Sequence, residues 1–280
     1  MAFEIYSLKM GELLIPEDGA LLLDPIYVWL VTDGITRILV DGGMPEIAEV
    51  TRRLKVDGSG GGHASLRTAL GSVGVTPEQI KFVVVTHLHY DHGSNLDLFP
   101  NACVVLQRDE LAHAVDPVPT QRLYYFKETA IHILGRKRPS TLRLVEGDLK
   151  LVDGIELLKV PGHTPGMQIP IVTTARGKVA LVTDLGDHYR NWYPADPRAT
   201  RFPLNYLADS FLPSSIRSES ERTYLESMRR AKNASDIVIP AHDTRIPLHI
   251  PNQWFDLPPI TQPEPPLIKL GGAVSVAAAH

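Results

Sequence analysis

Apolar and polar positions along the chain follow the patterns of β-strands in two blocks. In the first block, residues 3–9 alternate between apolar and polar side chains, and short β-branched runs follow. These runs predict further strands at 26–31, 36–40, 81–85 and 102–107. The second block predicts strands at 142–145, 155–160, 168–173 and 179–183, with a last strand at 236–240. Two such blocks are compatible with two sheets packed face to face, with helices outside.

Helices are expected where the sequence carries helix-start signals or an apolar stripe. Residues 65–73 and 109–114 fit short helices. Thr76-Pro77-Glu78-Gln79 has the form of a capping box with proline at the first helical position, and predicts one short helical turn. Ser218 and Glu221 form a second predicted capping box, for a helix that runs to about residue 232 and buries one apolar stripe.

Other segments lack a regular period. The run Asp-Gly-Ser-Gly-Gly-Gly at 57–62 predicts a flexible loop. Residues 115–140 and 186–215 are irregular and aromatic, which is typical of lids and binding loops. From about residue 247 the chain is rich in proline, and we expect an extended tail on the surface. The sequence therefore predicts a single domain over 1–280 with two aromatic insertions and a proline-rich tail.

Composition narrows the class of protein. With 280 residues, 44% hydrophobic and 21% charged, the chain can bury a full core of ordinary composition. A net charge of −4 gives no reason to expect nucleic-acid binding. We find no signal peptide and no apolar run of about 18 residues, so no membrane segment is expected. Cys103 is the only cysteine, which excludes an internal disulfide and fits a cytoplasmic location.

The strongest chemical signal follows the strand predicted at 81–85. There the sequence reads His87-Leu88-His89-Tyr90-Asp91-His92. His87 and His89 project to the same side of an extended segment, and Asp91 and His92 can turn toward a second point close by. Neutral imidazole and carboxylate are ligand types that Zn²⁺ and similar ions prefer. One short segment can therefore supply two adjacent metal ions.

Three more ligand-type side chains stand directly after apolar runs. They are His163, in the loop Pro-Gly-His-Thr-Pro-Gly, then Asp184, and finally His242. Strand ends that each offer one histidine or aspartate are expected if the strands converge on a single site. Asp41 also follows a strand, and its carboxylate either orients a metal-bound histidine or forms an Asx-turn.

In these motifs and their order, roughly residues 20–245 of the chain resemble the metallo-β-lactamase superfamily. The resemblance implies an α+β fold, an αββα four-layer sandwich with two metal ions at one edge of the sheets. It assigns His87, His89 and His163 to the first metal, Asp91, His92 and His242 to the second, and Asp184 to both. Asp91 is also placed to pass a proton to the leaving group.

Within the superfamily, a bridging aspartate resembles hydrolases of lactones, thioesters and phosphodiesters. Chain length and the aromatic insertions are most similar to quorum-quenching N-acyl homoserine lactonases and other small-lactone hydrolases. That resemblance implies ring opening by metal-bound hydroxide at two divalent ions, with zinc expected and manganese, iron or cobalt as alternatives. It implies a small-molecule lactone as the partner, no nucleic acid, no membrane, and a monomer or homodimer.

One position departs from those lactonases. They often carry a tyrosine three residues after the bridging aspartate, where it touches the substrate carbonyl. This chain has Asp187 there, so Tyr189 and Tyr206 are the catalytic candidates for that contact. Packing in the core or in a lid is the alternative for both tyrosines. Tyr90 occupies a place from which an aromatic ring can line the pocket.

Two other activities share these motifs. A glyoxalase II-like thioesterase usually adds a basic C-terminal helical domain, whereas only Lys269 follows Arg245 here. A mononuclear iron oxygenase of the persulfide dioxygenase type often lacks the second metal site, which Asp91, His92 and His242 would complete in this chain. Metal content separates these cases, because a hydrolase should hold two zinc-like ions and the oxygenase one iron.

Overall fold

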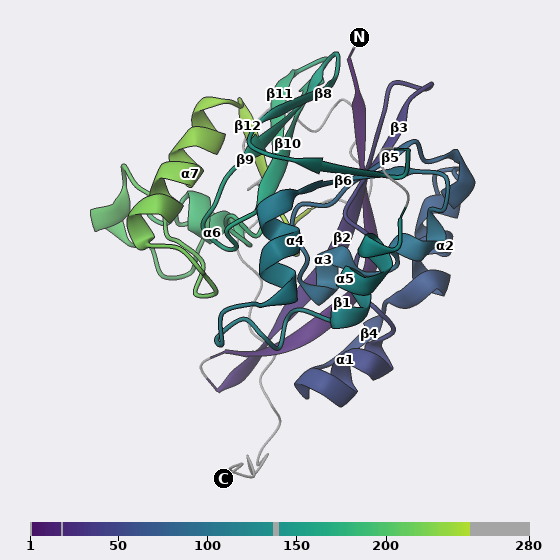
Figure 1. The fold of residues 1–280 in the computed structure, drawn as a ribbon. Coiled ribbons are helices and arrows are strands. Elements are labelled where there is room, and N and C mark those ends of the chain that lie inside the picture. Colours follow the sequence, from purple (N-terminus) through teal and green to yellow (C-terminus); the bar gives the residue numbers. More distant parts are fainter. Residues whose placement is uncertain (1, 18, 137–139, 247–280) are drawn as a thin grey trace.

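Two β-sheets form the centre of the computed structural model, which describes residues 2–17, 19–136 and 140–246 (Figure 1). The larger sheet has seven strands in the order β4-β1-β2-β3-β5-β6-β7. Their bounds are β1 Glu4–Glu17, β2 Ala20–Thr32, β3 Arg37–Val40, β4 Asp57–Gly60, β5 Phe82–Val84, β6 Cys103–Gln107 and β7 Leu142–Val145. The smaller sheet has five strands in the order β12-β11-β10-β9-β8. Their bounds are β8 Leu149–Val152, β9 Ile155–Lys159, β10 Gln168–Thr174, β11 Gly177–Thr183 and β12 Ile237–Pro240.

Helices lie on the outer faces of the two sheets and at their ends (Figure 1). The α-helices are α1 Ile47–Leu54, α2 Gly62–Gly71, α3 Tyr90–Gly93, α4 Arg108–Val115, α5 Lys127–Leu134, α6 Tyr189–Trp192 and α7 Glu221–Asn233. Short 3₁₀ turns are η1 Pro77–Gln79, η2 Leu96–Leu98 and η3 Asn205–Leu207. No helix among the described residues is long and apolar enough to cross a membrane.

Three layers of buried side chains hold the sheets and helices together. Between the sheets, Trp29 of β2 and Val84 of β5 belong to the same cluster as Leu181 of β11. The opposite face of the larger sheet packs against α2, α4 and α5, and the opposite face of the smaller sheet packs against α7. The layers therefore run helix, sheet, sheet, helix, which is the predicted αββα sandwich.

Parallel pairing brings the ligand-type residues to one edge of the sandwich. In the larger sheet β3 pairs with β5 in parallel, and in the smaller sheet β11 pairs with β12 in parallel. Parallel neighbours end on the same side, so residues that directly follow them come together. Asp41 follows β3, Asp184 follows β11 and His242 lies just after β12. The fold thus converts four separate strand ends, including that of β5, into one site.

Several predicted elements need correction. The strand at 142–145 is not in the second sheet, because β7 pairs in parallel with β6 at the edge of the larger sheet. The glycine-rich run at 57–62 is not a free loop: residues 57–60 form β4, an edge strand that pairs with β1. A Cβ at Gly58 would stand 2.1 Å from the backbone oxygen of Glu12, so this close pairing requires glycine.

Other corrections concern lengths and helix starts. β1 and β2 form one long hairpin, so both strands extend well beyond the predicted 3–9 and 26–31. The insertion at 115–140 contains α5 and is only partly irregular. The helix predicted from Ser218 begins later, because Ser220 is its N-cap and accepts a hydrogen bond from the backbone N–H of Thr223. The predicted tail from 247 lies outside the described residues.

Candidate metal centre

Two groups of buried histidines and aspartates lie at the edge where β5, β9, β11 and β12 end. Each offers donor atoms that lie within 4.8 Å of one another. The first group, called cluster 1 below, consists of His87, His89, His163 and Asp184. The second, cluster 2, consists of Asp91, His92, Asp184 and His242. The structure therefore brings together all seven residues that the sequence singled out as metal ligands, with Asp184 common to both groups.

Asp184 connects the clusters through its two carboxylate oxygens. Oδ2 lies 3.8 Å from Nε2 of His87 and 3.4 Å from Nε2 of His163, both in cluster 1. Oδ1 lies 3.1 Å from Nε2 of His92 and 3.3 Å from Nε2 of His242, both in cluster 2. In a tetrahedral site with bonds of about 2.0 Å, neighbouring ligand atoms stand about 3.3 Å apart. The spacing of the side chains therefore matches donors arranged around two adjacent centres.

Unpaired polar atoms point to the same arrangement. Nε2 of His87, Nε2 of His92 and Oδ1 of Asp184 are buried, and the described part of the chain gives none of them a partner in hydrogen-bond geometry. Buried polar groups in proteins are almost always satisfied, and exceptions call for an explanation such as an ion. Cation ligation by these atoms supplies that explanation, so the residues present fit two metal ions.

Backbone carbonyls fix the orientation of two ligand histidines. Nδ1 of His163 lies 2.8 Å from the carbonyl oxygen of Ile216, and Nδ1 of His242 lies 3.0 Å from that of Pro25. A carbonyl oxygen can only accept, so Nδ1–H is the donor in both rings, which leaves Nε2 as the nitrogen that could bind a metal. Such outer hydrogen bonds set the tautomer and the direction of a metal-ligating ring.

Asp41 performs the same task for His92. Its Oδ2 accepts a hydrogen bond from Nδ1 of His92 at 2.8 Å, while Thr86 donates its backbone N–H to Oδ1 and its hydroxyl to Oδ2. Asp41 has φ 65°, a left-handed conformation that aspartate and asparagine adopt more readily than other non-glycine residues. Of the two sequence interpretations, the structure supports the one in which Asp41 orients a ligand histidine.

Protonation of the histidines differs between the clusters. Burial and the neighbouring imidazoles hold the pKa of His87 and His89 well below the usual range, which keeps both rings neutral and able to ligate. For His92 and His242, burial acts in the same direction but the nearby carboxylates outweigh it and raise the pKa. A cation bound at cluster 2 would therefore compete with protons for Nε2 of His92 and His242.

Glu110 of α4 is a buried residue of this region that sequence reasoning missed. Its Oε1 accepts from the backbone N–H of Leu88 and from the hydroxyl of Tyr125, both at 2.9 Å. Its Oε2 accepts from the hydroxyl of Thr164 at 2.6 Å. Leu88 stands between two ligand histidines and Thr164 follows a third, so Glu110 joins two ligand-bearing loops. Its only sequence signal is a charged residue on an otherwise apolar helix face.

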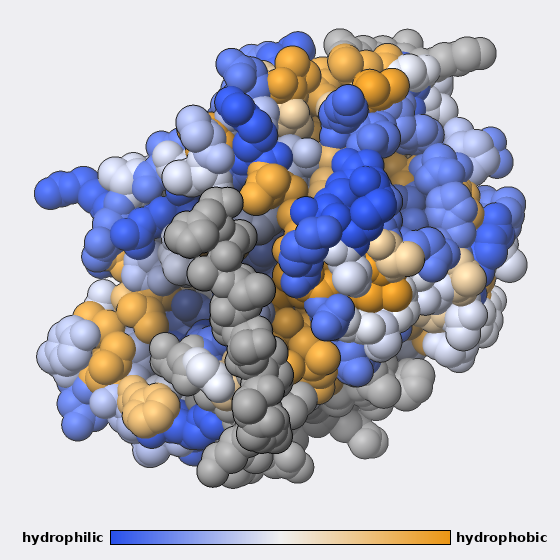
Figure 2. All heavy atoms as spheres, turned by 90° about the horizontal axis from the view of Figure 1, so that it is seen from below, coloured by the Kyte–Doolittle hydropathy of each residue, from blue (hydrophilic) through white to orange (hydrophobic). Residues whose placement is uncertain are grey.

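A cavity of about 610 Å³, called the metal cavity below, opens onto both clusters. Its lining includes ligand residues of both clusters, together with Tyr90 and Tyr124. Much of the remaining wall is aliphatic, contributed by Leu13, Ile15, Leu22, Leu54, Val56 and Leu123. From below, the surface shows apolar patches between hydrophilic ones (Figure 2). A cavity of this size that combines an apolar wall with charged and polar groups can hold a small molecule.

Neither candidate tyrosine lines the metal cavity. Tyr189 is fully buried in the core between the sheets, with the guanidinium of Arg245 over its ring. Tyr206 is 80% exposed, on η3. The interpretation that one of them touches a substrate carbonyl is therefore not supported, because packing places both elsewhere. The tyrosines on the cavity wall are Tyr90, which stacks on Phe126, and Tyr124.

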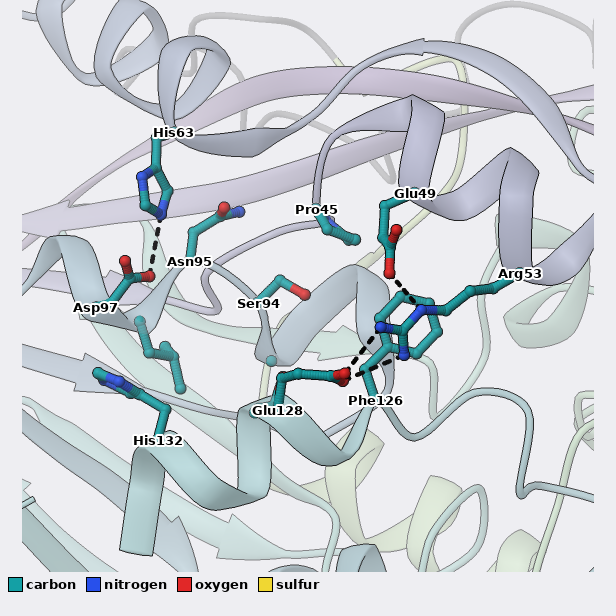
Figure 3. A pocket seen from close by; sticks show the side chains of 13 residues that line it. Pro45, Glu49, Arg53, His63, Ser94, Asn95, Asp97, Phe126, Glu128 and His132 are labelled. Atoms are coloured by element: carbon teal, nitrogen blue, oxygen red, sulfur yellow. Dashed lines mark hydrogen bonds and ion pairs between the residues drawn. The ribbon is translucent and has the colours of Figure 1, made fainter. Parts of the chain in front are cut away.

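A separate cavity of about 420 Å³ lies between α1, α5 and the residues that follow α3 (Figure 3). Arg53 crosses it: its guanidinium forms ion pairs with Glu49 and Glu128 and lies 4.2 Å from the centre of the Phe126 ring. At the other end His63 pairs with Asp97 at 3.0 Å. None of its lining residues belongs to either metal cluster.

Comparison with known proteins agrees with the fold and the site. The family model described as "Metallo-beta-lactamase superfamily" matches residues 21–242, a span that includes both clusters. An N-acyl homoserine lactonase from Bacillus cereus is 32% identical over 173 residues, which cover 59% of this chain and 65% of that protein. An N-acyl homoserine lactonase, AttM, from Agrobacterium fabrum is 27% identical over 195 residues, which cover 64% of this chain and 70% of that protein.

Solved structures show the same fold. The structure of an N-acyl homoserine lactone hydrolase with the product N-hexanoyl-L-homoserine at its catalytic metal centre superposes with a TM-score of 0.65 and 24% identity. The superposition covers 87% of this chain and 95% of that one.

Proposed function

Because this chain belongs to the metallo-beta-lactamase superfamily, we propose that it is a two-metal hydrolase that opens a lactone, with an N-acyl homoserine lactone as substrate. The observation that carries the proposal is the carboxylate of Asp184, whose two oxygens face two separate histidine clusters. The names of the similar proteins give the substrate class. The match spans 65% of the Bacillus cereus lactonase, so its activity is proposed for this chain rather than transferred.

Zinc is the metal we propose, held by the side chains of the two clusters. His87, His89 and His163 would hold the first ion, Asp91, His92 and His242 the second, and Asp184 both. Two bound divalent ions make water a nucleophile at neutral pH and polarise an ester carbonyl. Neither cluster contains Cys103, so every ligand is a nitrogen or an oxygen, which suits zinc and leaves manganese, iron and cobalt as competitors.

Asp91 is the residue we propose for proton transfer. Its Oδ2 lies 3.7 Å from Nε2 of His92 and 3.7 Å from Nε2 of His242, and the residue also lines the metal cavity. A carboxylate that belongs to cluster 2 and borders the cavity is within reach of an ester bound there. We propose that Asp91 accepts a proton from the attacking water and delivers it to the ring oxygen that leaves as the lactone opens.

The aliphatic wall is the part we propose for the acyl chain. Leu13 and Ile15 of β1 and Leu22 of β2 line the metal cavity together with Leu54 of α1. Removing an apolar chain from water against such a wall contributes about 0.8 kcal/mol per CH₂ group. The same side chains exclude water from the reacting ester. We therefore expect activity to rise with acyl length until the wall is filled.

The complete cluster 2 favours a two-metal hydrolase over a mononuclear iron oxygenase, because three residues besides Asp184 have their donor atoms grouped at the second position. The cytoplasmic location and the state of monomer or homodimer stay predictions from the sequence.

The proposal is tested by a hydrolysis screen on protein loaded with zinc. N-acyl homoserine lactones of increasing chain length, plain γ-lactones, a glutathione thioester and a phosphodiester are incubated with enzyme, and zinc is counted by elemental analysis. We expect two zinc ions per chain and the highest kcat/KM on an N-acyl homoserine lactone. Faster turnover of the thioester would make the thioesterase the correct function, and one tightly bound iron would support the oxygenase.

A further inference from the structure

Asp187 lines the metal cavity but belongs to neither metal cluster. It stands three residues after Asp184 and lines the metal cavity with His163, His188 and His242. It also lines a neighbouring cavity of about 420 Å³ formed by the 186–215 insertion. Asp187 therefore lies where the space next to the metal clusters meets the insertion.

Hydrogen bonds fix the position of Asp187 but satisfy only one of its carboxylate oxygens. Oδ2 accepts from the hydroxyl of Ser214 at 2.8 Å, and the backbone oxygen accepts from the N–H of His242 at 2.9 Å. Oδ1 is buried and has no hydrogen-bond partner among the described residues. A buried acceptor without a donor loses its hydration without compensation, so a donor is expected at this point when a ligand is bound.

The chemistry of Oδ1 determines which ligand group it can contact. A carboxylate oxygen accepts hydrogen bonds, and it repels a carbonyl oxygen or the negative charge that grows on it during hydrolysis. Two nearby groups that could carry positive charge face other carboxylates: Nε2 of His188 lies 3.4 Å from Asp24, and Arg190 forms an ion pair with Glu17 at 2.8 Å. The partner that suits Oδ1 is therefore a donor on the substrate that lies beside the reacting ester.

We propose that Asp187 is a specificity-determining residue whose Oδ1 accepts a hydrogen bond from an N–H group adjacent to the lactone ring of the substrate. This inference rests on the proposed function and refines it. A lactone with an amide at the carbon next to its carbonyl carries such an N–H, whereas a plain γ-lactone has none. Asp187 thus distinguishes amide-bearing lactones from plain ones, separately from the aliphatic wall that receives the chain.

The test compares two substrates that differ only at the donor. N-hexanoyl-L-homoserine lactone carries the N–H, and its N-methyl derivative replaces that hydrogen with a methyl group. kcat/KM is measured for both with the zinc-loaded wild type and with Asp187→Leu, whose side chain has a similar volume and no acceptor. Taking the ratio of the two substrates within each protein cancels effects of the variant on chemistry and of the methyl group on fit.

We expect the wild type to prefer the N–H substrate by roughly 10- to 100-fold, the range of a hydrogen bond to a charged group. In Asp187→Leu this ratio should fall to within about threefold of unity. Asp187→Asn, which keeps a neutral oxygen acceptor, should give an intermediate ratio and replaces the leucine variant if the latter does not fold. The control Asp153→Leu makes the same change at an exposed turn residue and should keep the wild-type ratio.

An unchanged ratio in Asp187→Leu, whether or not activity on both substrates falls, would overturn the inference while leaving the lactonase proposal intact. Binding gives a second readout that does not need turnover. Calorimetry with N-hexanoyl-L-homoserine and its N-methyl form should show tighter binding of the N–H acid to the zinc-loaded wild type only. If the wild type opens neither lactone, the proposed function fails, and equal affinity for the two acids then also rejects the role of Asp187.

Discussion

Replacing Asp41 with asparagine should weaken cluster 2 without touching a metal ligand. Asp41 accepts three hydrogen bonds, two from Thr86 and one from Nδ1 of His92. Asparagine has nearly the same shape and tolerates the left-handed φ of 65° at this position, so the backbone need not move. The substitution therefore isolates the loss of one acceptor oxygen and of the negative charge.

The size of the effect follows from these three bonds. One acceptor oxygen is replaced by an NH₂ group, which either faces Nδ1–H of His92 or faces the backbone N–H of Thr86. In the first orientation Nδ1–H of His92 loses its acceptor and the Thr86 hydroxyl has to turn away. In the second the backbone N–H of Thr86 loses its acceptor, and the hydrogen bond from His92 goes to a neutral oxygen. A hydrogen bond to a charged group contributes about 1.5–3 kcal/mol, which is about 10- to 100-fold in metal affinity, the range found for such outer partners of ligand histidines.

Zinc titration followed by imidazole ¹⁵N NMR measures this for each cluster separately. Signals of His92 and His242 report cluster 2, and those of His87, His89 and His163 report cluster 1. We expect the zinc Kd of cluster 2 to rise by about 10- to 100-fold. Cluster 1 should change by less than about threefold, since the carbonyl oxygen of Ile216 that orients His163 is unaffected. Asp41 contacts cluster 1 only indirectly, through the Thr86 hydroxyl, which lies 3.2 Å from Nδ1 of His87.

Asp33→Asn is the matched control, because Asp33 accepts backbone hydrogen bonds in the exposed turn between β2 and β3 and is remote from the metals. It should leave the zinc affinity of both clusters as in the wild type. Unchanged affinity of cluster 2 in Asp41→Asn, or an equal loss in both clusters, would refute the idea that Asp41 acts on the metal through His92.

Three further substitutions test other parts of the account. Asp184→Asn removes one of the two carboxylate oxygens that face the clusters. Zinc content should fall from two toward one per chain, and kcat/KM for the lactone should fall by at least about 100-fold. Full zinc content and turnover would mean that Asp184 does not bridge two metals. Glu110→Gln leaves one of three buried donors unpaired, so the free energy of unfolding measured in urea should fall by about 1–3 kcal/mol. An unchanged midpoint would contradict the role of Glu110 in joining the two ligand-bearing loops. Arg53→Ala loses a partly exposed ion pair with Glu128, so the free energy of unfolding should fall by about 1 kcal/mol or less while zinc content stays unchanged. Loss of zinc would mean that the cavity around Arg53 is coupled to the metal clusters.

The elements that could be predicted from sequence are those whose signal is local. β-branched runs predicted β5 and β6. The capping box at Thr76 predicted η1, where the backbone N–H of Thr76 donates to Oε1 of Gln79 at 3.0 Å. The ligand histidines and aspartates could be found because each directly follows an apolar run. Their convergence on one site is expected from the motifs, whereas the parallel pairing of β3 with β5 and of β11 with β12 comes only from the structure.

What the sequence could not reveal depends on contacts between distant residues. β4 consists of Asp-Gly-Ser-Gly, which has no strand preference, and it exists because its backbone pairs with β1. β7 lies in sequence between the strands of the larger sheet and those of the smaller one. Only its pairing with β6 assigns it to the larger sheet. Tyr189 looked like a substrate contact by position, but its ring is placed by the core between the sheets.

The central claim is that two metal ions held by the two clusters open a lactone. The direct test starts from metal-free protein, adds zinc in steps from zero to three equivalents, and measures the opening of N-hexanoyl-L-homoserine lactone at each step. The account predicts that activity rises until two equivalents are bound and then stays constant. Full activity at one equivalent, or no ring opening above the buffer rate with two zinc ions bound, would contradict it.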